Sequence, residues 1–373
     1  AKDLRRYISA DKLEKTPSTM AHSTKNGELA ESAAIDRPAP ASKRSALAAL
    51  LPTGLKDLIK AALRSGSMRW LNNALQWRAD RRYKKGKRPH SAAEIRQALN
   101  ALPLPDRSVV FIHSSMSRLG YLEGGADALV AALRDVMVRG RNGTVAVPTY
   151  SMTGGMADTL RAGQLFDLRN TPSGTGRLTE LLRRQPDARR SLHPTHSVAA
   201  IGPLASWLVE GHHLDPRCFG PLSPLARLVE ADGFVLGLGV DLGPVTFYHL
   251  IEDLGGFPVD VYTPDSPLVA HCLDERGGRV EFPVMAHDPS ASVTRIDRPN
   301  GAAIRSYMTT VLENSAGLTW FRIGDGRMWL VSARRFYDCL ILLRDRGITI
   351  YATAEQVASL PPPASVLHAV SGS

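Results

Sequence analysis

The apolar positions of the chain follow two patterns, and together these patterns predict an α/β protein. Short apolar runs at residues 109–112, 144–147 and 234–240 have the length of buried strands. Elsewhere apolar residues recur every three or four positions, as Ile95 and Leu99 do, which is the spacing of a helix that buries one face. We therefore expect a central mixed sheet flanked by helices.

Capping and turn residues indicate where some elements begin and end. Ser91 and Glu94 have the spacing of a capping box, so we expect a helix to begin after Ser91. Gly277-Gly278 is expected to form the turn of one hairpin, and residues 320–331 a second hairpin. Residues 151–165 show neither pattern, so they are expected to form a polar loop of the kind that often carries specificity.

The first part of the chain differs from the rest. Residues 1–44 lack any periodicity and predict a disordered tail, and residues 361–373 predict a loose C-terminal tail. Residues 45–89 combine apolar residues at helical spacing with tryptophans and a basic run, which predicts an amphipathic helical basic extension. This extension would pack on the folded domain as a hairpin, contact an anionic membrane peripherally through residues 45–88, or bind RNA by charge alone.

Charge and cysteine usage narrow the class of protein. The first 100 residues carry 21 Lys+Arg against 9 Asp+Glu, so of the total net charge of +10 they hold 21 − 9 = +12 and the rest holds −2. The basic character thus belongs to the N-terminal segment, and no specific nucleic-acid partner is expected for the folded part. Three widely spaced cysteines without a CxxC pair favour neither a disulfide framework nor a zinc ribbon. With no long apolar run either, we expect a cytoplasmic protein, membrane-peripheral if the extension makes it so.

The stretch from residue 234 to residue 256 combines a strand with candidate chemistry. Its apolar run is followed by a glycine-rich turn and by a helix that Thr246 would cap and that Gly255-Gly256 would end. His249 would lie in the first turn of this helix, with Glu252 three residues on along the same face. The positive end of the helix dipole would disfavour an imidazolium and keep His249 a neutral proton acceptor. The alternative is a buried structural histidine beside a solvated Glu252.

Polar residues also follow the strand at residues 109–112. His113, Ser114 and Ser115 come at its carboxyl end, where α/β sheets bind ligands. Gly124-Gly125 then opens a helix, and the free N–H groups of a helix start attract phosphate. A purely structural strand-to-helix turn would explain the glycines but not the polar strand end.

Two pairs of histidines lie between these stretches. His193 and His196 suggest zinc ligands at first sight, but no third ligand lies at a familiar spacing and HExxH is absent, so no metal is expected. His212 and His213 fall in a turn and are expected to be solvated.

Several separate motifs, in order, resemble one family. They are VVFIHSSMSRLGYLEGG (109–125), FDLRNTPSGTGRLTELLRR (166–184), RSLHPTHSVAAIGP (190–203), FGPLSPLARLVEADG (219–233) and VLGLGVDLGPVTFYHLIEDLGG (235–256). Over residues 90–350 the chain resembles the aminoglycoside 3-N-acetyltransferases, whose fold is called antibiotic N-acetyltransferase. The resemblance implies an acetyltransferase domain over residues 90–360 that transfers acetyl from acetyl-CoA to an amine, an activity associated with antibiotic resistance.

The resemblance also implies roles for individual residues. It assigns His249 as general base within a TxxHxxE motif formed by Thr246, His249 and Glu252. It places residues 195–197 on a strand of the active-site wall and gives His193 a structural role. The residues that it assigns to CoA are His113, Ser114, Ser115, Ser117, Leu119, Gly120, Gly124, Gly125, Thr195, His196 and Ser197.

The carboxylate partner of His249 and the acceptor stay open at this point. Members of the family have a glutamate after the next hairpin, but the spacing of RVEFPVMAHDPS (279–290) differs, so Asp288 or Glu281 would substitute, with His287 also present. The acceptor would be an aminoglycoside or another amino sugar, such as a polysaccharide precursor, because the part after residue 100 is nearly neutral. The alternative in another class is a degenerate member that acts as a binding or scaffold protein.

Overall fold

The computed structural model describes residues 88–253, 257–291, 293 and 295–363. The predicted tail at residues 1–44 and nearly all of the predicted basic extension at 45–89 lie outside the described residues, as do residues 364–373. The expected membrane contact therefore also lies outside them. Of the helices that the structure describes, none is both long and apolar enough to cross a bilayer.

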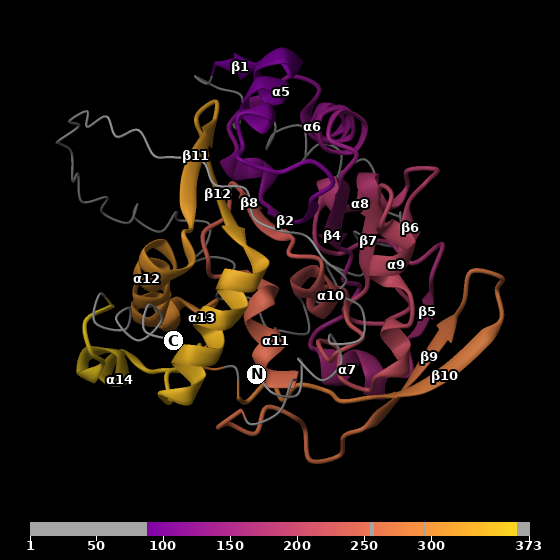
Figure 1. Cartoon of the computed structure of the whole chain (residues 1–373). Helices are drawn as coiled ribbons and strands as arrows, with labels where there is room; N and C mark the ends of the chain where they lie inside the picture. The colour runs from indigo at the N-terminus through magenta and orange to yellow at the C-terminus, as the bar shows by residue number, and fades with distance from the viewer. Residues whose placement is uncertain (1–87, 254–256, 292, 294, 364–373) are drawn as a thin grey trace, which may run out of the picture. The chain divides into compact units, whose positions relative to one another are not determined.

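A seven-stranded mixed sheet forms the centre of the fold (Figure 1). Its strand order is β11-β12-β8-β2-β4-β7-β6. Strands β8, β2 and β4 are mutually parallel, and the other neighbours pair antiparallel. The bounds are β2 (Val109–Ser114), β4 (Thr144–Pro148), β6 (Arg189–Arg190), β7 (Val198–Ile201), β8 (Phe234–Leu238), β11 (Thr319–Ile323) and β12 (Gly326–Ser332). The predicted mixed sheet is thus confirmed, together with the predicted β11–β12 hairpin.

Two smaller sheets lie beside the central one. Strands β1 (Pro89–His90) and β3 (Tyr121–Leu122) pair in parallel. A three-stranded sheet has the order β10-β9-β5, with β9 (Leu268–Leu273) antiparallel to β10 (Arg279–Val284) and parallel to β5 (Leu165–Asp167). The hairpin expected around Gly277-Gly278 is the β9–β10 pair.

Helices cover both faces of the central sheet because its strands are apolar on both sides. Along β2, Val109 and Phe111 belong to one core cluster, and Val110 and Ile112 to the other. The second cluster takes its helical residues from α5 (Ala92–Asn100), α6 (Gly125–Leu133), the π-helical turn η2 (Arg134–Gly140) and α8 (Arg177–Arg183). The first takes them from α9 (Ala205–Val209), α10 (Pro224–Glu230), α12 (Ala302–Val311) and α13 (Ala333–Asp345), among others. Continuous apolar strands and amphipathic helices therefore build one layered α/β core.

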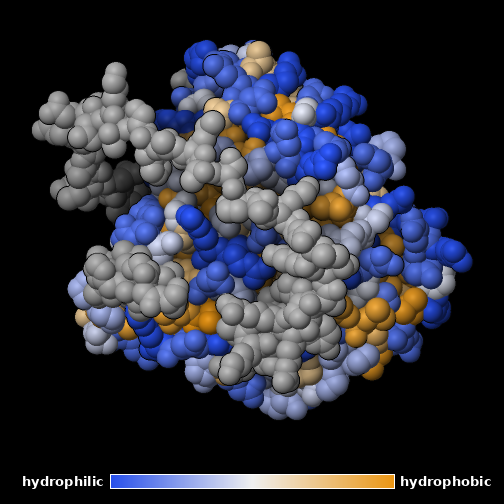
Figure 2. Space-filling view, viewed as in Figure 1, coloured by the Kyte–Doolittle hydropathy of each residue, from blue (hydrophilic) through white to orange (hydrophobic). Residues whose placement is uncertain are grey.

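Local signals place several helices as expected. Ser91 and Glu94 form the predicted capping box of α5, with the Ser91 hydroxyl accepting the Glu94 N–H and the Glu94 carboxylate accepting the Ser91 N–H. Beyond α13, α14 (Ala354–Ser359) is the last helix of the described chain. Figure 2 shows that the face seen in this view is mostly polar, with apolar side chains in small patches.

The prediction of a patternless loop over residues 151–165 is wrong. This segment contains α7 (Met156–Arg161) and the first residue of β5. Met156, Ala157 and Leu160 are buried, so the helix does have an apolar face. Its six residues are too few for the repeat to stand out in the sequence.

Candidate active site

The candidate residues gather at one edge of the central sheet. The parallel strands β2, β4 and β8 end at this edge, and β7, which is antiparallel to β4, begins there. His113 and Ser114 are the last residues of β2, and the chain beyond β8 leads to His249. Strand topology therefore brings together three segments that are far apart in the sequence (Figure 1).

The end of β8 and the turn after it each require a glycine. A Cβ at Gly237 would lie 2.1 Å from the Trp329 ring, so glycine lets β8 pack closely on that indole. Gly239 has a φ of +67°, and a Cβ there would lie 2.7 Å from the Ser115 carbonyl oxygen. Gly237 thus lets β8 approach β12 closely, and Gly239 lets the turn after β8 approach the end of β2.

The helical segment after this turn begins differently from the prediction. It consists of a 3-10 turn, η4 (Thr246–His249), and the short α11 (Leu250–Asp253). The prediction that Thr246 caps this helix is wrong, because Val245 precedes its first residue and makes no side-chain cap. The Thr246 hydroxyl instead accepts a hydrogen bond of 2.8 Å from the Tyr150 hydroxyl, which ties the ends of β4 and β8 together.

His249 and Glu252 form a buried hydrogen-bonded pair. Nδ1 of His249 lies 2.8 Å from Oε2 of Glu252, whose side chain is fully buried. The Tyr351 hydroxyl donates to the other oxygen, Oε1, at 2.8 Å. Burial raises the pKa of Glu252, but His249, His287 and the Tyr351 hydroxyl outweigh it and hold the pKa below its usual value. Glu252 is therefore an ionised partner of His249, and the alternative of a solvated Glu252 is wrong.

A second histidine shares this carboxylate. Nδ1 of His287 lies 3.6 Å from Glu252 Oε2, and its Nε2 lies 3.5 Å from Asp253 Oδ1. Burial lowers the pKa of His287, but Asp253 and Glu252 outweigh it and raise the pKa above its usual value. Asp253 also accepts hydrogen bonds from the Tyr262 hydroxyl and, at 2.7 Å, from the Phe219 N–H.

Asp288 and Glu281 have other partners. Asp288 accepts the N–H of Ser290 at 2.8 Å through its Oδ1. Glu281 pairs with His271 at 2.9 Å on the exposed side of the β9–β10 hairpin. Among the described residues, the carboxylate hydrogen-bonded to His249 is that of Glu252, and the structure does not bring Asp288 or Glu281 into that position.

The segment around His196 is a turn and not a strand, so the expectation of a strand at residues 195–197 is wrong. β7 begins at Val198. The His193 ring accepts the His196 N–H at 3.1 Å, which closes this turn. The Thr195 hydroxyl lies 3.0 Å from His196 Nδ1.

His196 lies one ring away from His249. Its ring packs edge-on against Phe219, with 5.0 Å between centroids, and Phe219 stacks on His249 at 5.5 Å. Burial, with His287 and His249 nearby, holds the pKa of His196 well below its usual value, so the ring is neutral.

Ser197 has a structural environment. It is fully buried, and its hydroxyl donates to the Thr149 carbonyl oxygen at 2.8 Å and accepts from Arg190 Nε at 3.1 Å. Of the three residues 195–197, His196 is thus the one that contacts Phe219, the ring stacked on His249.

The prediction that His212 is solvated is wrong. His212 is buried, its ring stacks on that of His193 at 4.7 Å, and its Nε2 donates to the Cys218 carbonyl oxygen at 2.8 Å. Its Nδ1 lies 2.9 Å from the Ser191 hydroxyl. Both ring nitrogens are therefore satisfied inside the protein, which the polar sequence of the turn did not indicate. His213 is half-buried.

The strand-end segment after β2 combines buried and accessible groups. His113 is buried, its Nε2 has no hydrogen-bond partner among the described residues, and burial lowers its pKa to about 4. Ser114 and Ser115 are partly exposed, and Ser117 is exposed. Leu119 and Gly120 are buried, so neither residue lines a surface.

The start of α6 is open. Gly124 and Gly125 have φ values of +72° and +58°, and a Cβ on Gly125 would meet nothing within 4 Å. A phosphate-bearing ligand can therefore approach the backbone at Gly125 closely.

Comparison with known proteins identifies the family. A family profile described as aminoglycoside 3-N-acetyltransferase matches residues 111–343, which is more than half of the chain. The chain belongs to the aminoglycoside 3-N-acetyltransferase family. It is an acyltransferase of this class, as the sequence predicted.

Individual relatives agree with this assignment. Aminoglycoside N(3)-acetyltransferase VII of Streptomyces paromomycinus is 34% identical over 238 residues, which cover 58% of this chain and 82% of the relative. Aminoglycoside N(3)-acetyltransferase IX of Micromonospora chalcea is 38% identical over 179 residues, 44% of this chain and 63% of the relative. The alignment with this second relative thus spans less than two thirds of its length.

Solved structures have the same fold. The structure of aminoglycoside acetyltransferase AAC(3)-Xa superposes with a TM-score of 0.56 and 30% identity, over 70% of this chain and 93% of the other. The binary complex of AAC-IIIb with CoASH gives a TM-score of 0.59 and 25% identity, over 70% and 98%.

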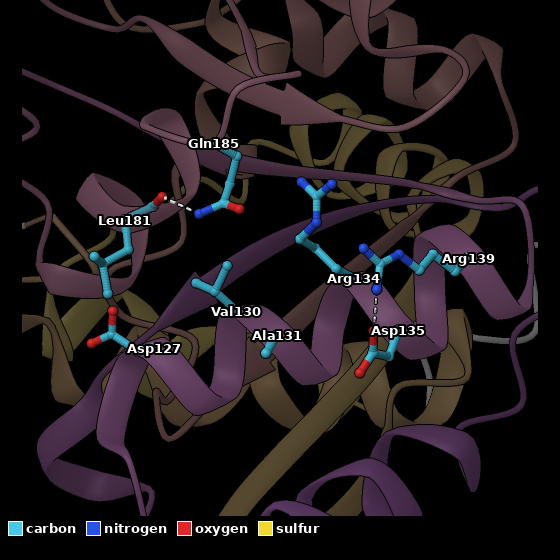
Figure 3. A pocket seen from close by; sticks show the side chains of 8 residues that line it. All are labelled: Asp127, Val130, Ala131, Arg134, Asp135, Arg139, Leu181 and Gln185. Atoms are coloured by element: carbon cyan, nitrogen blue, oxygen red, sulfur yellow. Dashed lines mark hydrogen bonds and ion pairs between the residues drawn. The ribbon is translucent and has the colours of Figure 1, made fainter.

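A separate pocket of about 200 Å³ lies between α6 and α8 of this acetyltransferase (Figure 3). Its charged lining residues have partners: Arg139 bonds Asp135, Arg134 bonds Asp187 and Arg177 bonds Asp127. Figure 3 shows Gln185 bonded to the Leu181 carbonyl on its wall. None of its lining residues belongs to the candidate active site. Helices α6 and α8 contribute to the second core cluster, the one that also contains Val110 and Ile112 of β2.

Several residues of the candidate active site could not be predicted from the sequence. Asp253, which adjoins Glu252, and Phe219 were within quoted motifs, but nothing in their spacing pointed to contact with a histidine. Tyr351 reaches Glu252 from 99 positions further along the chain. Tyr262 reaches Asp253 from a loop. Only the folded arrangement reveals these long-range contacts.

Proposed function

We propose that this chain transfers the acetyl group of acetyl-CoA to an amino group of an aminoglycoside or related amino sugar, with His249 as general base. The observation that carries the proposal is the 2.8 Å hydrogen bond between His249 Nδ1 and Glu252 Oε2. An ionised carboxylate accepts a hydrogen bond, so Nδ1 carries the proton and Nε2 keeps its lone pair. Nε2 is then the atom that accepts a proton.

The chemistry follows from this tautomer. The amine nitrogen forms a bond to the thioester carbonyl carbon, the carbon–sulfur bond breaks, and CoA leaves as the thiolate, which then receives the proton from His249 to become the thiol. His249 Nε2 takes the proton that the amine loses, and Glu252 stabilises the resulting imidazolium. General-base assistance of this kind is typically worth about 10²–10⁴-fold in rate.

The strand-end segment and the turn before β7 are the proposed CoA-binding surface. Support comes from the partly exposed Ser114 and Ser115, from the open backbone at Gly125, and from His196, which lies one ring away from His249. The AAC-IIIb relative was crystallised with CoASH, which fits this assignment. Ser117 and Gly124 belong to the same proposed surface, whereas Thr195, Ser197 and Leu119 are buried and support it from within the core.

The proposed acceptor class rests on the family and on charge. AAC-VIa, which is 25% identical with a TM-score of 0.56, was solved bound to sisomicin. Glu252 and Asp253 place two ionised carboxylates beside the base, and burial is outweighed for both by the groups around them, so their pKa values lie below the usual range. Negative charge of this kind favours an ammonium-bearing acceptor.

The test is a His249→Ala variant, with His271→Ala as matched control. His271 also pairs with a glutamate, Glu281, at 2.9 Å, but on an exposed hairpin. We expect kcat for aminoglycoside acetylation to fall by about 10²–10⁴-fold in His249→Ala and to change little in the control, with the Kd for CoA similar in both. Parallel loss of CoA affinity would show that His249 has a structural role instead, and a lack of acetyl transfer by the wild-type chain would favour a binding protein.

A further inference from the structure

The strongest unassigned feature is the set of donor atoms around Glu252. His249, Glu252 and His287 each offer one ligating atom, and the three atoms lie within 4.8 Å of one another. The general-base proposal uses His249 and Glu252 and leaves His287 without a role. Two imidazoles and a carboxylate are a known ligand set for zinc, with a fourth position open to water or substrate.

The two distances from Glu252 to the histidines suit a metal ion after small adjustments, and the two histidine atoms lie within 4.8 Å of each other. Ligand bonds of about 2.0–2.2 Å in a tetrahedral site put donor atoms roughly 3.3–3.5 Å apart. Glu252 Oε2 lies 2.8 Å from His249 Nδ1 and 3.6 Å from His287 Nδ1. The distance between His249 Nδ1 and Glu252 Oε2 must therefore increase by about half an ångström. The distance between His287 Nδ1 and Glu252 Oε2 can stay almost as it is. His249 and His287 retain some exposure, 11% and 13% of their side chains, so an ion can reach them from solvent.

The surroundings of the three ligands match those of metal sites. Metal-bound histidines commonly donate their other ring N–H to a carboxylate, and bound carboxylates are themselves hydrogen-bonded. His287 Nε2 faces Asp253 Oδ1 at 3.5 Å, and the Tyr351 hydroxyl holds the second oxygen of Glu252 at 2.8 Å. Asp253 is fixed in turn by the Phe219 N–H. A second sphere for an ion is thus already in place.

A competing set, Cys218, Asp253 and His287, also lies within 4.8 Å. A cysteine binds metal as thiolate, and Cys218 is completely buried, next to Asp253 and Glu252, which raises its pKa well above the usual value. Asp253 is also occupied by the donors of Tyr262 and Phe219. The His249 set is therefore the better one.

We propose that His249, Glu252 and His287 bind a divalent transition-metal ion such as Zn²⁺, and that this ion inhibits the enzyme. The inhibition rests on the proposed function of His249. A neutral imidazole that binds a metal through Nδ1 carries its only proton on Nε2. Nε2 then becomes a donor and can no longer accept a proton from the amine. Without the ion, His249 thus acts as the base and Glu252 as its partner. With the ion, both residues are ligands.

The direct test is a titration of the EDTA-treated full chain with Co²⁺, followed by visible absorption and by displacement with Zn²⁺. We expect one ion per chain at this site. His287→Gln should weaken binding by more than about 100-fold, because loss of a second-sphere partner alone costs about 10–100-fold. His271→Gln, which alters the exposed histidine of a similar His–Glu pair, should bind as the wild type does. Equal affinity in both variants, or no binding by the wild type at millimolar Co²⁺, would overturn the proposal.

The activity test separates the site from the function. Zn²⁺ should abolish acetyl transfer by the wild type, EDTA should restore it, and His287→Gln should be less sensitive by the same factor as its affinity. Binding without inhibition would overturn the tautomer argument. If His249→Ala acetylates normally while Co²⁺ still binds with the expected variant pattern, the general-base proposal fails and the metal site stands. Should His287→Gln not fold, Tyr351→Phe is the second variant, with an expected loss of about 10–100-fold in affinity.

Discussion

Glu252 is the single residue on which the proposed chemistry most depends. Its carboxylate receives the His249 Nδ1–H and the Tyr351 hydroxyl, and it is completely buried. Glu252→Gln keeps an oxygen acceptor of nearly the same shape but removes the charge. We expect kcat to fall by roughly 10²-fold or more with little change in KM, because the charge matters when the imidazolium forms. Steady-state kinetics with one aminoglycoside would measure this.

Asp288→Asn is the matched comparison, since the spacing in the sequence made Asp288 a rival for the same role. Its side chain accepts the Ser290 N–H. The expected change in kcat is within about twofold, typical of a substitution away from the reacting atoms. A large loss in Asp288→Asn with a small one in Glu252→Gln would reverse the assignment of the carboxylate.

At the scale of single residues, the sequence predicts side-chain contacts within one helical turn. It does not predict contacts between residues that are far apart in the chain. His249 and Glu252 are three residues apart, so their shared face could be read directly. The contact between Tyr351 and Glu252, and that between His287 and Asp253, join segments whose approach depends on how the layers pack. No spacing rule reports on such packing.

Among the elements, the short strand β6 joins others through Arg190. The Arg190 guanidinium donates to the carbonyl oxygens of Thr149 and Thr171 at 2.8 and 2.6 Å, and its Nε donates to the Ser197 hydroxyl at 3.1 Å. It also lies 4.7 Å above the Phe166 ring. This one side chain therefore connects the end of β4, the turn before β7, and β5.

We expect Arg190→Lys to lower the free energy of unfolding by about 2–4 kcal/mol. An ammonium group has three donors and no planar fork, so several of these buried acceptors would lose their hydrogen bonds, at about 1–3 kcal/mol each. Arg189→Lys is the control on the same strand, since Arg189 is exposed and pairs with Glu275 at 3.4 Å. Urea denaturation would compare the two, and equal stabilities would refute the connecting role of Arg190.

Element prediction succeeded where local chemistry decides and failed where length or context does. The capping box at Ser91 and the two hairpins follow from residues a few positions apart. Helix α7 could not be predicted because two turns give too short a repeat. The strand at residues 195–197 was implied by the family resemblance, and the structure has a turn there, closed by the His193 ring.

On the scale of the whole molecule, buried neutral histidines should make the fold sensitive to acid. Burial lowers the pKa of His113 and of His212 to about 4, and also holds those of His193 and His196 well below 6.5. The unfolded chain binds protons at these groups near pH 6.5, whereas the folded chain does not until a lower pH. Stability is therefore present above pH 6.5 and is lost as the pH falls toward 4.

As the pH falls from 7 to 5, the lowered pKa of His113 and that of His212 should each reduce the free energy of unfolding by about 2 kcal/mol, because the unfolded chain takes up the proton first. His287 has a raised pKa and the opposite sign, but its contribution changes above pH 6.5 and does not offset this loss. Urea titrations at several pH values would measure the slope. In His212→Gln the slope of the free energy of unfolding against pH should decrease by the equivalent of about one bound proton. An unchanged slope would contradict the assignment of His212 as a buried neutral group.

The Tyr351–Glu252 hydrogen bond determines when the enzyme can become active during its synthesis. Tyr351 follows His249 by 351 − 249 = 102 residues, yet it completes the environment of Glu252, the carboxylate hydrogen-bonded to this proposed base. At a translation rate of about 5–20 residues per second, roughly 5–20 s separate the synthesis of the two. During that interval a nascent chain contains both His249 and Glu252 but lacks the Tyr351 hydroxyl that donates to Glu252. Activity should therefore appear only when the last helices fold, and not when the sheet forms.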